Sequence, residues 1–207
     1  MQELKNLIEN ENYSAALDFL NQSDSMALPI KYYNLGFIHF KQNDLPSALY
    51  YLEKAKFSGL FSEEVDSALY QVKTELGLRV LENDYSWIDQ LYLSSNTLNL
   101  DIFIVLMGFL LFGILLGAYK KLFKTAALCL TMFTALGIFT YQLSEMKTYI
   151  AFEDTIIHQG PSQIFEANQV IPKGLKFVIG KSFKDWSYIK YPSVLSGWVK
   201  DIKAKKL

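Results

Sequence analysis

The chain has 207 residues, one cysteine and a formal net charge of −1, and 51% of its residues are hydrophobic. A single cysteine excludes a disulfide within the chain and a thiol pair for a metal site. Residues 1–97 hold 7 Lys or Arg against 14 Asp or Glu, whereas residues 146–207 hold 10 Lys against 5 Asp or Glu. The acidic first part and the dispersed lysines of the last part argue against a nucleic-acid partner, and favour two solvated surfaces of opposite sign.

Residues 31–56 predict two antiparallel helices, over about residues 29–41 and 45–57. Asp44 is expected to cap the second helix and Pro46 to lie in its first turn. Gly36 is expected to face Ala48 where the helices cross. The pattern resembles the tetratricopeptide (TPR) signature, and the matching residues are Tyr32-x2-Leu35-Gly36-x2-His39 and Ala48-x3-Leu52-x2-Ala55.

Two further segments extend this helical part. Tyr13-x2-Ala16-x3-Leu20 matches Leu45-x2-Ala48-x3-Leu52 at a 32-residue offset, which predicts a degenerate first repeat over residues 1–22. Ser62 is placed to cap a third helix, and residues 79–84 would form the partner of that helix. We therefore predict TPR-like helical repeats over residues 1–83.

The first helices of such repeats normally line a concave groove. In the predicted helix over residues 29–41, Tyr33, Asn34, Phe37 and Lys41 would point into this groove. Asn34 and Lys41 could hold the backbone or the terminal carboxylate of a partner peptide. Each residue taken alone could equally be an ordinary solvated or inter-repeat contact, but for the groove as a whole we expect a protein partner.

Residues 84–97 are expected to link the repeats to a membrane. An aromatic and apolar face can be drawn on a short helix here, and Tyr and Trp favour the membrane–water boundary; its members are Tyr85, Trp87, Ile88, Leu91 and Tyr92. One interpretation is an amphipathic helix lying on the membrane surface, and the other is a helix packed on the last repeat. Residues 94–97 are expected to end this helix and to cap the next.

Two uncharged apolar runs follow, over residues 102–118 and 125–143, joined by the sequence YKKLFK. A membrane-spanning helix needs about 20 mostly apolar residues, and each run is close to that length. We predict two transmembrane helices over residues 98–145, with a short basic loop at residues 119–124. The alternative is a buried hairpin in a soluble core, although such helices usually carry a polar stripe.

Small residues in the two runs indicate close helix packing. Gly113 and Gly117 form a small-x3-small pair, with Gly108 and Gly137 nearby. These glycines would pack the two spans together or dock a partner's span. Apart from Cys129 and Tyr141, no ionisable residue lies inside either run, which argues against a proton relay, a transport path or an intramembrane enzyme.

The loop lysines predict the orientation of the hairpin. Lys120, Lys121 and Lys124 crowd the loop, whereas residues 82–101 hold no Lys or Arg. The positive-inside rule therefore places the loop in the cytoplasm and both flanking domains in the periplasm, at a bacterial inner membrane. The first residues show no secretory signal. We expect a cleaved signal outside this sequence, export of the N-terminus by the first span, or the opposite orientation.

Residues 146–207 predict a small all-β domain. Strands are expected over about residues 150–157, 167–171, 175–180, 186–191 and 196–199, with turns at 158–162 and 172–174. Five short strands at this spacing suit a small barrel. Residues 203–207 are expected to form a tail.

Motifs in this segment resemble the bacterial SH3-like (SH3b) pattern. The matching runs are Ile157-His158-Gln159-Gly160-Pro161-Ser162, Pro172-Lys173-Gly174, Trp186-Ser187-Tyr188-Ile189 and Gly197-Trp198-Val199, with His158 in place of Arg. Such folds bind peptides or cell-wall stems, which implies a binding surface at Trp186, Tyr188 and Tyr191. Both tryptophans could instead fill the core, and we expect this for Trp198. A catalytic or metal-binding role for His158 is not expected.

The order of these parts resembles the BatE family, the TPR membrane proteins of the Bat (Bacteroides aerotolerance) operons. The run WIDQLYLSSNTLNLDIFIVLMGFLLFGILL is similar to the segment by which that family enters the membrane. The resemblance implies a periplasm-facing scaffold that acts with von Willebrand A-domain membrane proteins and a MoxR-type AAA+ ATPase. A role in stress tolerance or envelope quality control would follow from the family. Such chains normally begin with a signal peptide, and this one departs from them there.

The sequence as a whole predicts a multidomain membrane protein with TPR repeats, a two-helix transmembrane hairpin and an SH3-like barrel. We expect a non-enzymatic scaffold or adaptor that binds protein partners through the TPR groove and the barrel, without cofactor or metal. The alternative is a cell-envelope sensor whose SH3b domain binds peptidoglycan. An enzyme is the weakest option, because the sequence holds no nucleophile triad, metal cluster or phosphate loop.

Overall fold

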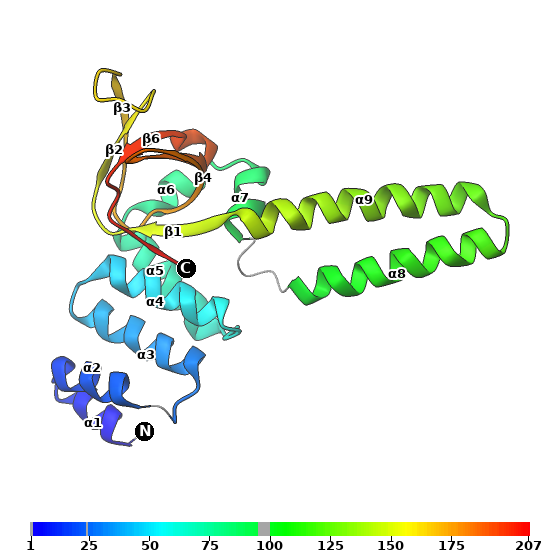
Figure 1. Cartoon of the computed structure of the whole chain (residues 1–207). Helices are drawn as coiled ribbons and strands as arrows, with labels where there is room; N and C mark the ends of the chain where they lie inside the picture. The colour runs from blue at the N-terminus through cyan, green and yellow to red at the C-terminus, as the bar shows by residue number, and fades with distance from the viewer. Residues whose placement is uncertain (1, 24, 95–99) are drawn as a thin grey trace. The chain divides into compact units, whose positions relative to one another are not determined.

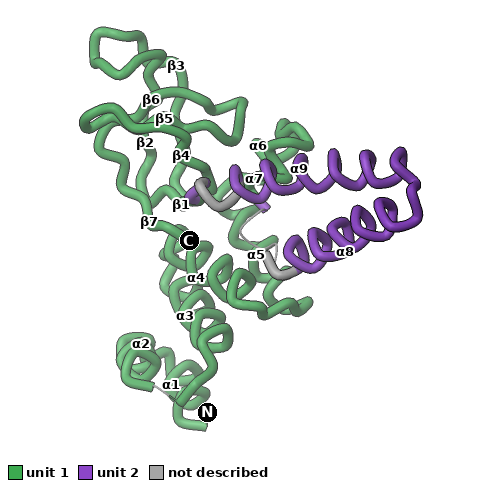
Figure 2. The backbone as a smooth tube through the Cα atoms, turned by 45° about the vertical axis from the view of Figure 1, so that its right-hand side comes forward, with its two compact units in different colours: residues 1–93, 148–207 green, residues 94–147 purple. Residues whose placement is uncertain are grey.

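The computed structural model describes residues 2–23, 25–94 and 100–207, with the backbone alone at residues 100, 101 and 143–145. The chain divides into two compact units, green and purple in Figure 2. Unit 1 comprises Met1–Leu93 and Thr148–Leu207, and unit 2 comprises Ser94–Lys147. Unit 1 is therefore discontinuous in sequence. The predicted cap at residues 95–97 lies outside the described residues.

The first part of unit 1 is helical (Figure 1). Its helices are α1 (Gln2–Glu9), α2 (Tyr13–Gln22), α3 (Leu28–Lys41), α4 (Leu45–Phe57), α5 (Glu63–Glu75), α6 (Leu78–Glu82) and α7 (Trp87–Ser94). Local signals fix where α4 and α5 begin, because the Asp44 carboxylate accepts a hydrogen bond from the Ser47 N–H at 3.3 Å and the Ser62 hydroxyl accepts one from the Val65 N–H at 3.4 Å. Pro46 lies in the first turn of α4, as predicted.

Helices α3 and α4 approach each other closely at Gly36. A Cβ atom added to Gly36 would lie 2.8 Å from Leu52 Cγ, so a larger residue would force the helices apart. The atoms nearest to this Cβ atom belong to Leu52, one helical turn after Ala48, the residue that Gly36 was predicted to face. Ala16 and Leu20 in α2 are as deeply buried as Ala48 and Leu52, 32 residues later in the sequence.

The last part of unit 1 is an open antiparallel sheet, and the described residues place its seven strands in the order β3-β2-β6-β5-β4-β1-β7. The strands are β1 (Lys147–Ala151), β2 (Thr155–His158), β3 (Ala167–Ile171), β4 (Lys176–Phe183), β5 (Trp186–Tyr191), β6 (Gly197–Lys200) and β7 (Ala204–Lys206), with the 3-10 turn η2 (Ser193–Leu195) before β6. The predicted strand at residues 150–157 is divided into β1 and β2. The predicted tail is wrong, since β7 pairs with β1 and places Lys206 opposite Tyr149.

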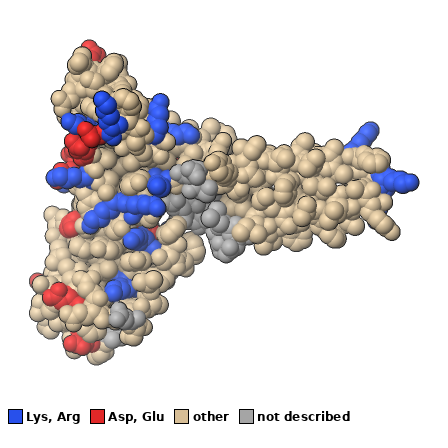
Figure 3. Space-filling model, viewed as in Figure 1, with Lys and Arg blue, Asp and Glu red and all other residues tan. Residues whose placement is uncertain are grey.

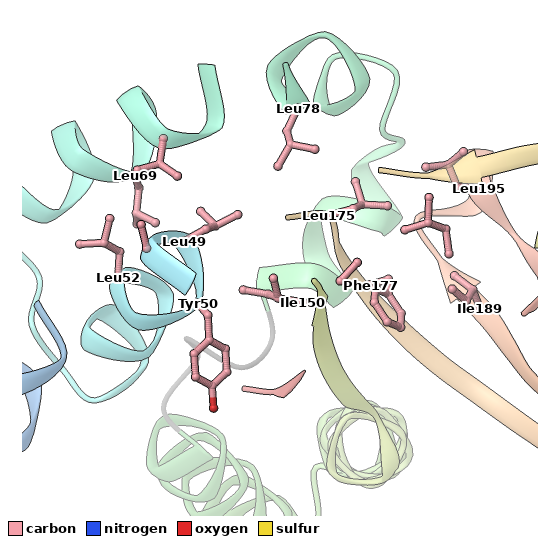
Figure 4. Close-up of a cluster of buried hydrophobic side chains, with 14 of the residues drawn as sticks. Leu49, Tyr50, Leu52, Leu69, Leu78, Ile150, Leu175, Phe177, Ile189 and Leu195 are labelled. Atoms are coloured by element: carbon pink, nitrogen blue, oxygen red, sulfur yellow. The ribbon is translucent and has the colours of Figure 1, made fainter. Parts of the chain in front are cut away.

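A single hydrophobic cluster joins the helices of unit 1 to its sheet (Figure 4). Leu49, Leu69 and Leu78 come from α4, α5 and α6, whereas Phe177 and Ile189 come from β4 and β5. These five side chains are at most 6% exposed. Burying a side chain of this size contributes roughly 1.5–3 kcal/mol, so the shared cluster is a principal source of the stability of unit 1.

Helix α7 is held on the sheet by a buried carboxylate. Asp89 is 0% exposed and accepts hydrogen bonds from the N–H and hydroxyl of Ser86 at 2.9 and 2.7 Å. It also accepts bonds from the N–H and hydroxyl of Ser193 in η2 at 2.7 and 2.8 Å. Burial raises the pKa of Asp89, but these four bonds outweigh burial and lower it. Helix α7 therefore packs against the sheet at Asp89, while Trp87 is 73% exposed, and a position of this helix at a membrane surface stays a prediction.

Unit 2 consists of α8 (Leu100–Tyr119) and α9 (Phe123–Glu145). Ile102–Tyr119 and Phe123–Gln142 are long and apolar enough to cross a membrane. At about 1.5 Å per residue, 20 residues cover the roughly 30 Å of a hydrocarbon core. Hardly any of either segment is buried, and Phe109 and Phe112 are 70% and 60% exposed. The hairpin is therefore not a buried core of this chain.

Candidate binding surfaces

The four residues predicted to line the helical groove all lie on α3, but they differ in what they contact. Tyr33 is half-buried against the shared cluster. The Asn34 amide donates a hydrogen bond to the Ile30 carbonyl oxygen at 2.9 Å, within its own helix. Lys41 is exposed, and its ammonium nitrogen lies 5.4 Å from the ring centre of Phe37. Phe37 and Lys41 are therefore the pair that a partner could reach, and binding there stays a prediction.

A row of four side chains crosses the outer face of the sheet, one from each of four adjacent strands. Lys181 in β4 lies opposite Tyr188 in β5, Tyr188 opposite Trp198 in β6, and Trp198 opposite His158 in β2. Directly opposite residues in an antiparallel sheet point to the same face. Ile189, next to Tyr188, points to the other face and is buried in the shared cluster. These four residues, called the outer row below, therefore lie on the face opposite that cluster.

Lys181 places a positive charge over the aromatic rings of the outer row. Its ammonium nitrogen is 5.1 Å from the ring centre of Tyr188 and 5.3 Å from that of Trp198. The two rings meet edge to face with their centres 5.4 Å apart. Both aromatic side chains are half-buried, and Lys181 is exposed. The row thus presents to solvent an ammonium group that lies over two aromatic rings. An exposed cation–π interaction of this kind contributes about 0.5–1 kcal/mol.

Trp186 lies on the same face as the outer row, opposite Lys200, but it is not the exposed residue that was predicted. Its side chain is only 7% exposed, and its ring meets the His158 ring edge to face at 5.3 Å. His158 Nδ1 lies 3.0 Å from the Phe165 carbonyl oxygen, which holds the imidazole in place. Trp186 is therefore buried beside His158 on the outer face and not within the shared cluster. Trp198, expected in the core, is half-buried beside Lys181 instead.

Tyr191 is half-buried between the sheet and α7. Its ring stacks on the ring of Tyr92 with the centres 4.5 Å apart. Burial raises the pKa of the Tyr191 hydroxyl, and Tyr92 raises it further. Tyr191 therefore belongs to the contact that docks α7, while Tyr188 is the predicted SH3-like surface residue that lies in the outer row.

Lys181 is the residue of the outer row that the sequence analysis missed, and a local signal could have found it. Strands β4 and β5 are joined by the two-residue turn Lys184-Asp185, with Lys184 at φ 52°. A two-residue turn fixes the register of a hairpin, so the residues three before and three after the turn must lie opposite each other. Those residues are Lys181 and Tyr188.

A buried carboxylate at the helix–sheet contact had no such signal. Glu53 in α4 is 6% exposed and lies 3.0 Å from Lys176 Nζ in β4 and 3.6 Å from Lys73 Nζ in α5. Burial alone would raise the pKa of Glu53, but the two ammonium groups outweigh burial and lower the pKa to about 2. Lys73 also pairs with Glu82 of α6 at 2.8 Å. This network joins the helices to the sheet, and Glu53 is its most buried member.

Two of the four glycines predicted to pack the spans lie at the contact between α8 and α9. A Cβ atom added to Gly117 would lie 3.0 Å from Ala126 Cβ and 3.1 Å from Ala126 N. One added to Gly113 would lie 3.0 Å from Cys129 Sγ. The predicted alternatives were packing of the two spans together and docking of a partner's span. Gly113 and Gly117 pack the two spans of this chain against each other.

The other two glycines leave open space in the hairpin. A Cβ atom added to Gly108 would meet no described atom within 4 Å. At Gly137 the nearest such atom is the Met107 methyl carbon at 3.9 Å. Neither position requires glycine for the contact between α8 and α9, and docking of a partner's span at these positions stays a prediction.

The predicted loop lysines lie at the turn of the hairpin. Residues 120–122 connect the two helices, so the loop is shorter than the predicted residues 119–124. Lys120 and Lys121 lie in this loop and Lys124 in the first turn of α9, and all three are exposed. In the view of Figure 3 the blue side chains of the hairpin gather at this turn, whereas its length is tan. The end that carries the turn is therefore basic.

No family model, curated protein or solved structure matches the chain. Function must therefore be argued from these surfaces and from the motifs in the sequence.

Proposed function

We propose that the chain is a membrane-anchored adaptor without enzymatic activity, which binds protein partners at the surface of unit 1. One observation carries this proposal: a hairpin with exposed apolar side chains is inserted into a folded unit that presents aromatic and lysine side chains to solvent. An adaptor needs an anchor and a recognition surface. The hairpin would supply the first, and the outer row with the groove of α3 the second.

The proposed topology follows from the discontinuity of unit 1. Its two parts share one hydrophobic cluster, so both must lie on the same side of a membrane, which fits a hairpin that crosses twice. Lys120, Lys121 and Lys124 at the turn support a cytoplasmic loop by the positive-inside rule. Unit 1 would then lie in the periplasm, at a bacterial inner membrane.

We assign the helical part of unit 1 to TPR-like repeats. The close contact between Gly36 and Leu52 supports this assignment, as does the burial of equivalent residues at the 32-residue offset. His39, which stands where the signature has Tyr, stacks on Tyr51 with the ring centres 5.2 Å apart. The sheet would be an SH3-like fold, on the strength of the motifs around Gly160, Gly174 and Gly197.

The resemblance to the BatE family suggests the partners. These would be von Willebrand A-domain membrane proteins and a MoxR-type AAA+ ATPase system, acting in stress tolerance or envelope quality control. The test is co-purification of the tagged full chain from its native membrane in mild detergent. An A-domain protein should co-purify, and less of it with a Phe37→Ser/Lys41→Glu variant than with the exposed control Lys5→Gln. If no A-domain protein comes down with the wild-type chain, the scaffold proposal fails.

A protease experiment tests the topology separately. Intact spheroplasts would be treated with a protease, and antibodies against unit 1 would follow its cleavage. We expect both parts of unit 1 to be cleaved without lysis. Protection of both parts would reverse the orientation and with it the choice of partners.

The outer row favours one second candidate, a cell-envelope sensor that binds peptidoglycan. Tyr188 and Trp198 are aromatic groups of the kind that SH3b-type surfaces present. Because the sheet shares its core with the helices, the test uses the full chain in detergent, sedimented with insoluble peptidoglycan. Retention that is lost in a Trp198→Ala variant would support the sensor. Absence of retention would remove this candidate and leave the adaptor.

A further inference from the structure

The lysines of the sheet fall into two groups by their ionic partners. Some pair with carboxylates, since Lys176 lies 3.0 Å from Glu53 and Lys203 lies 2.7 Å from Glu153. Others, on the outer face, form no ion pair with any carboxylate of the described residues. These are Lys181, Lys190 and Lys200.

All three unpaired lysines lie on the face that carries the outer row. Lys181 is a member of the row, whereas Lys190 follows Tyr188 in β5 and Lys200 follows Trp198 in β6 by two residues, which places both on the same face. The acidic residues nearest in sequence, Asp185 and Asp201, lie at the ends of β4, β5 and β6 and pair with none of the three lysines. The face therefore has three uncompensated positive charges beside half-buried aromatic rings.

The position of Lys181 decides which ligand suits this face. Its ammonium group lies over the rings of both Tyr188 and Trp198. A nucleic-acid base or a sugar ring that stacked on these side chains would have to displace that ammonium group. A carboxylate would instead pair with it from the solvent side and leave the cation–π contact intact. The charge and the ring geometry therefore favour an acidic ligand over a stacking one.

We propose that the outer face of the sheet binds an acidic segment of a protein partner. This inference rests on the proposed adaptor function and names the chemistry of its partner. One carboxylate would pair with Lys181 and a second with Lys200, while an apolar side chain midway between them, on the same side of the extended peptide, covers Tyr188 and Trp198. Lys181 and Lys200 are separated by two strands and two residues, or about 12 Å, which an extended peptide covers in about four residues.

The test measures binding of a designed peptide to the full chain in detergent micelles. The probe is the fluorescent peptide GSEGFGESG, whose two Glu residues are four positions apart with the Phe midway between them. The controls are GSQGFGQSG, which lacks the charges, and GSEEGFGSG, which has them side by side. We expect the first peptide to bind most tightly, with an affinity that falls as salt is added.

Variants of single lysines assign the site. Lys181→Gln should weaken binding of the acidic probe about tenfold or more, because a charge-assisted hydrogen bond is lost. The matched control is Lys173→Gln, an exposed lysine in the turn before β4 that should change the affinity less than about twofold. Circular dichroism and tryptophan fluorescence would confirm that both variants are folded.

Several results would overturn the proposal. Equal binding of the acidic and the uncharged peptide would do so, as would equal effects of Lys181→Gln and Lys173→Gln. Tighter binding of a single-stranded dT oligonucleotide or of a soluble muropeptide, lost in Lys181→Gln, would assign the face to another ligand. If an A-domain protein still co-purifies with Lys181→Gln, this inference fails and the adaptor function stands.

Discussion

Unit 1 buries its large apolar side chains, whereas unit 2 exposes them. In unit 1, Phe177 and Leu49 are at most 1% exposed, whereas in unit 2, Phe109 and Phe112 are at least 60% exposed. Apolar surface in water is costly, so the first arrangement suits water and the second suits lipid. The boundary between the two units falls within a residue or two of the ends of α7 and β1.

The largest expected effect concerns the cluster that gives unit 1 its buried interior. Phe177→Ala should lower the free energy of unfolding by about 4 kcal/mol, because it removes a fully buried ring. Hydrogen exchange of the full chain in micelles, followed by mass spectrometry, would report the loss. Amides of α4 and β4 should lose protection together and those of α8 should keep it. Loss confined to β4 would show that the helices and the sheet are stabilised separately.

The buried ion network tests whether unit 1 depends on charge as well as on apolar burial. Glu53→Gln should cost about 3 kcal/mol, because Lys176 and Lys73 would keep their charges without the carboxylate that compensates them. The matched control is Glu153→Gln, which breaks an exposed pair with Lys203 and should cost less than about 1 kcal/mol. Urea denaturation followed by tryptophan fluorescence would compare the two. Equal costs would mean that burial adds nothing to the Glu53 network.

Acid should destabilise unit 1 through the same carboxylate. The pKa of Glu53 in the folded chain is about 2, below its ordinary value of 4.5, so the charged form is favoured by folding. Its contribution, at most about 3 kcal/mol, is complete above pH 4.5 and is lost as the pH falls from 4.5 towards 2. Denaturation midpoints across this range would show the loss. The Glu53→Gln variant should lack this part of the pH dependence, and an identical pH profile would contradict the assignment.

The smallest change in stability is expected in unit 2, where the experiment tests whether residue 113 in α8 lies close to Cys129 in α9. Gly113→Cys should form a disulfide with Cys129 under mild oxidation, since a Cβ atom at residue 113 would lie 3.0 Å from Cys129 Sγ. Gly108→Cys is the matched control, because a Cβ atom there has no described neighbour within 4 Å. Intact-mass measurement of the alkylated protein would count free thiols. Equal oxidation of the two variants within single chains would contradict the packing of α8 on α9.

Much of the helical part and the hairpin could be predicted, because their signals are local. The side chains of Asp44 and Ser62 cap helices a few residues away, and the apolar runs of the hairpin depend only on composition. The strands β3 and β5 were also predicted, since turn residues bound them on both sides. Each of these features is decided within a few residues of sequence.

The remaining features depend on residues far apart in the chain. Glu53 and Lys176 are 123 residues apart, and nothing near either residue shows that it will be paired. Strand β7 has the sequence AKK, which resembles a polar tail until β1 supplies its hydrogen bonds. Trp186 is buried because His158 covers it, and this depends on how β2 and β5 are brought together. Such placements follow from the topology rather than from local pattern.

The discontinuity of unit 1 also sets an order of events during synthesis. The ribosome completes α4, α5 and α6 first, then the residues of unit 2, and only afterwards the strands that cover those helices. Translation adds about 5–20 residues per second, so several seconds pass between the synthesis of Leu49, Leu69 and Leu78 and that of Phe177 and the rest of the sheet. Under the proposed topology, insertion of the hairpin into a membrane falls within this interval. During this interval the nascent helices therefore expose an apolar face that the sheet covers later, and a holding chaperone would bind that face.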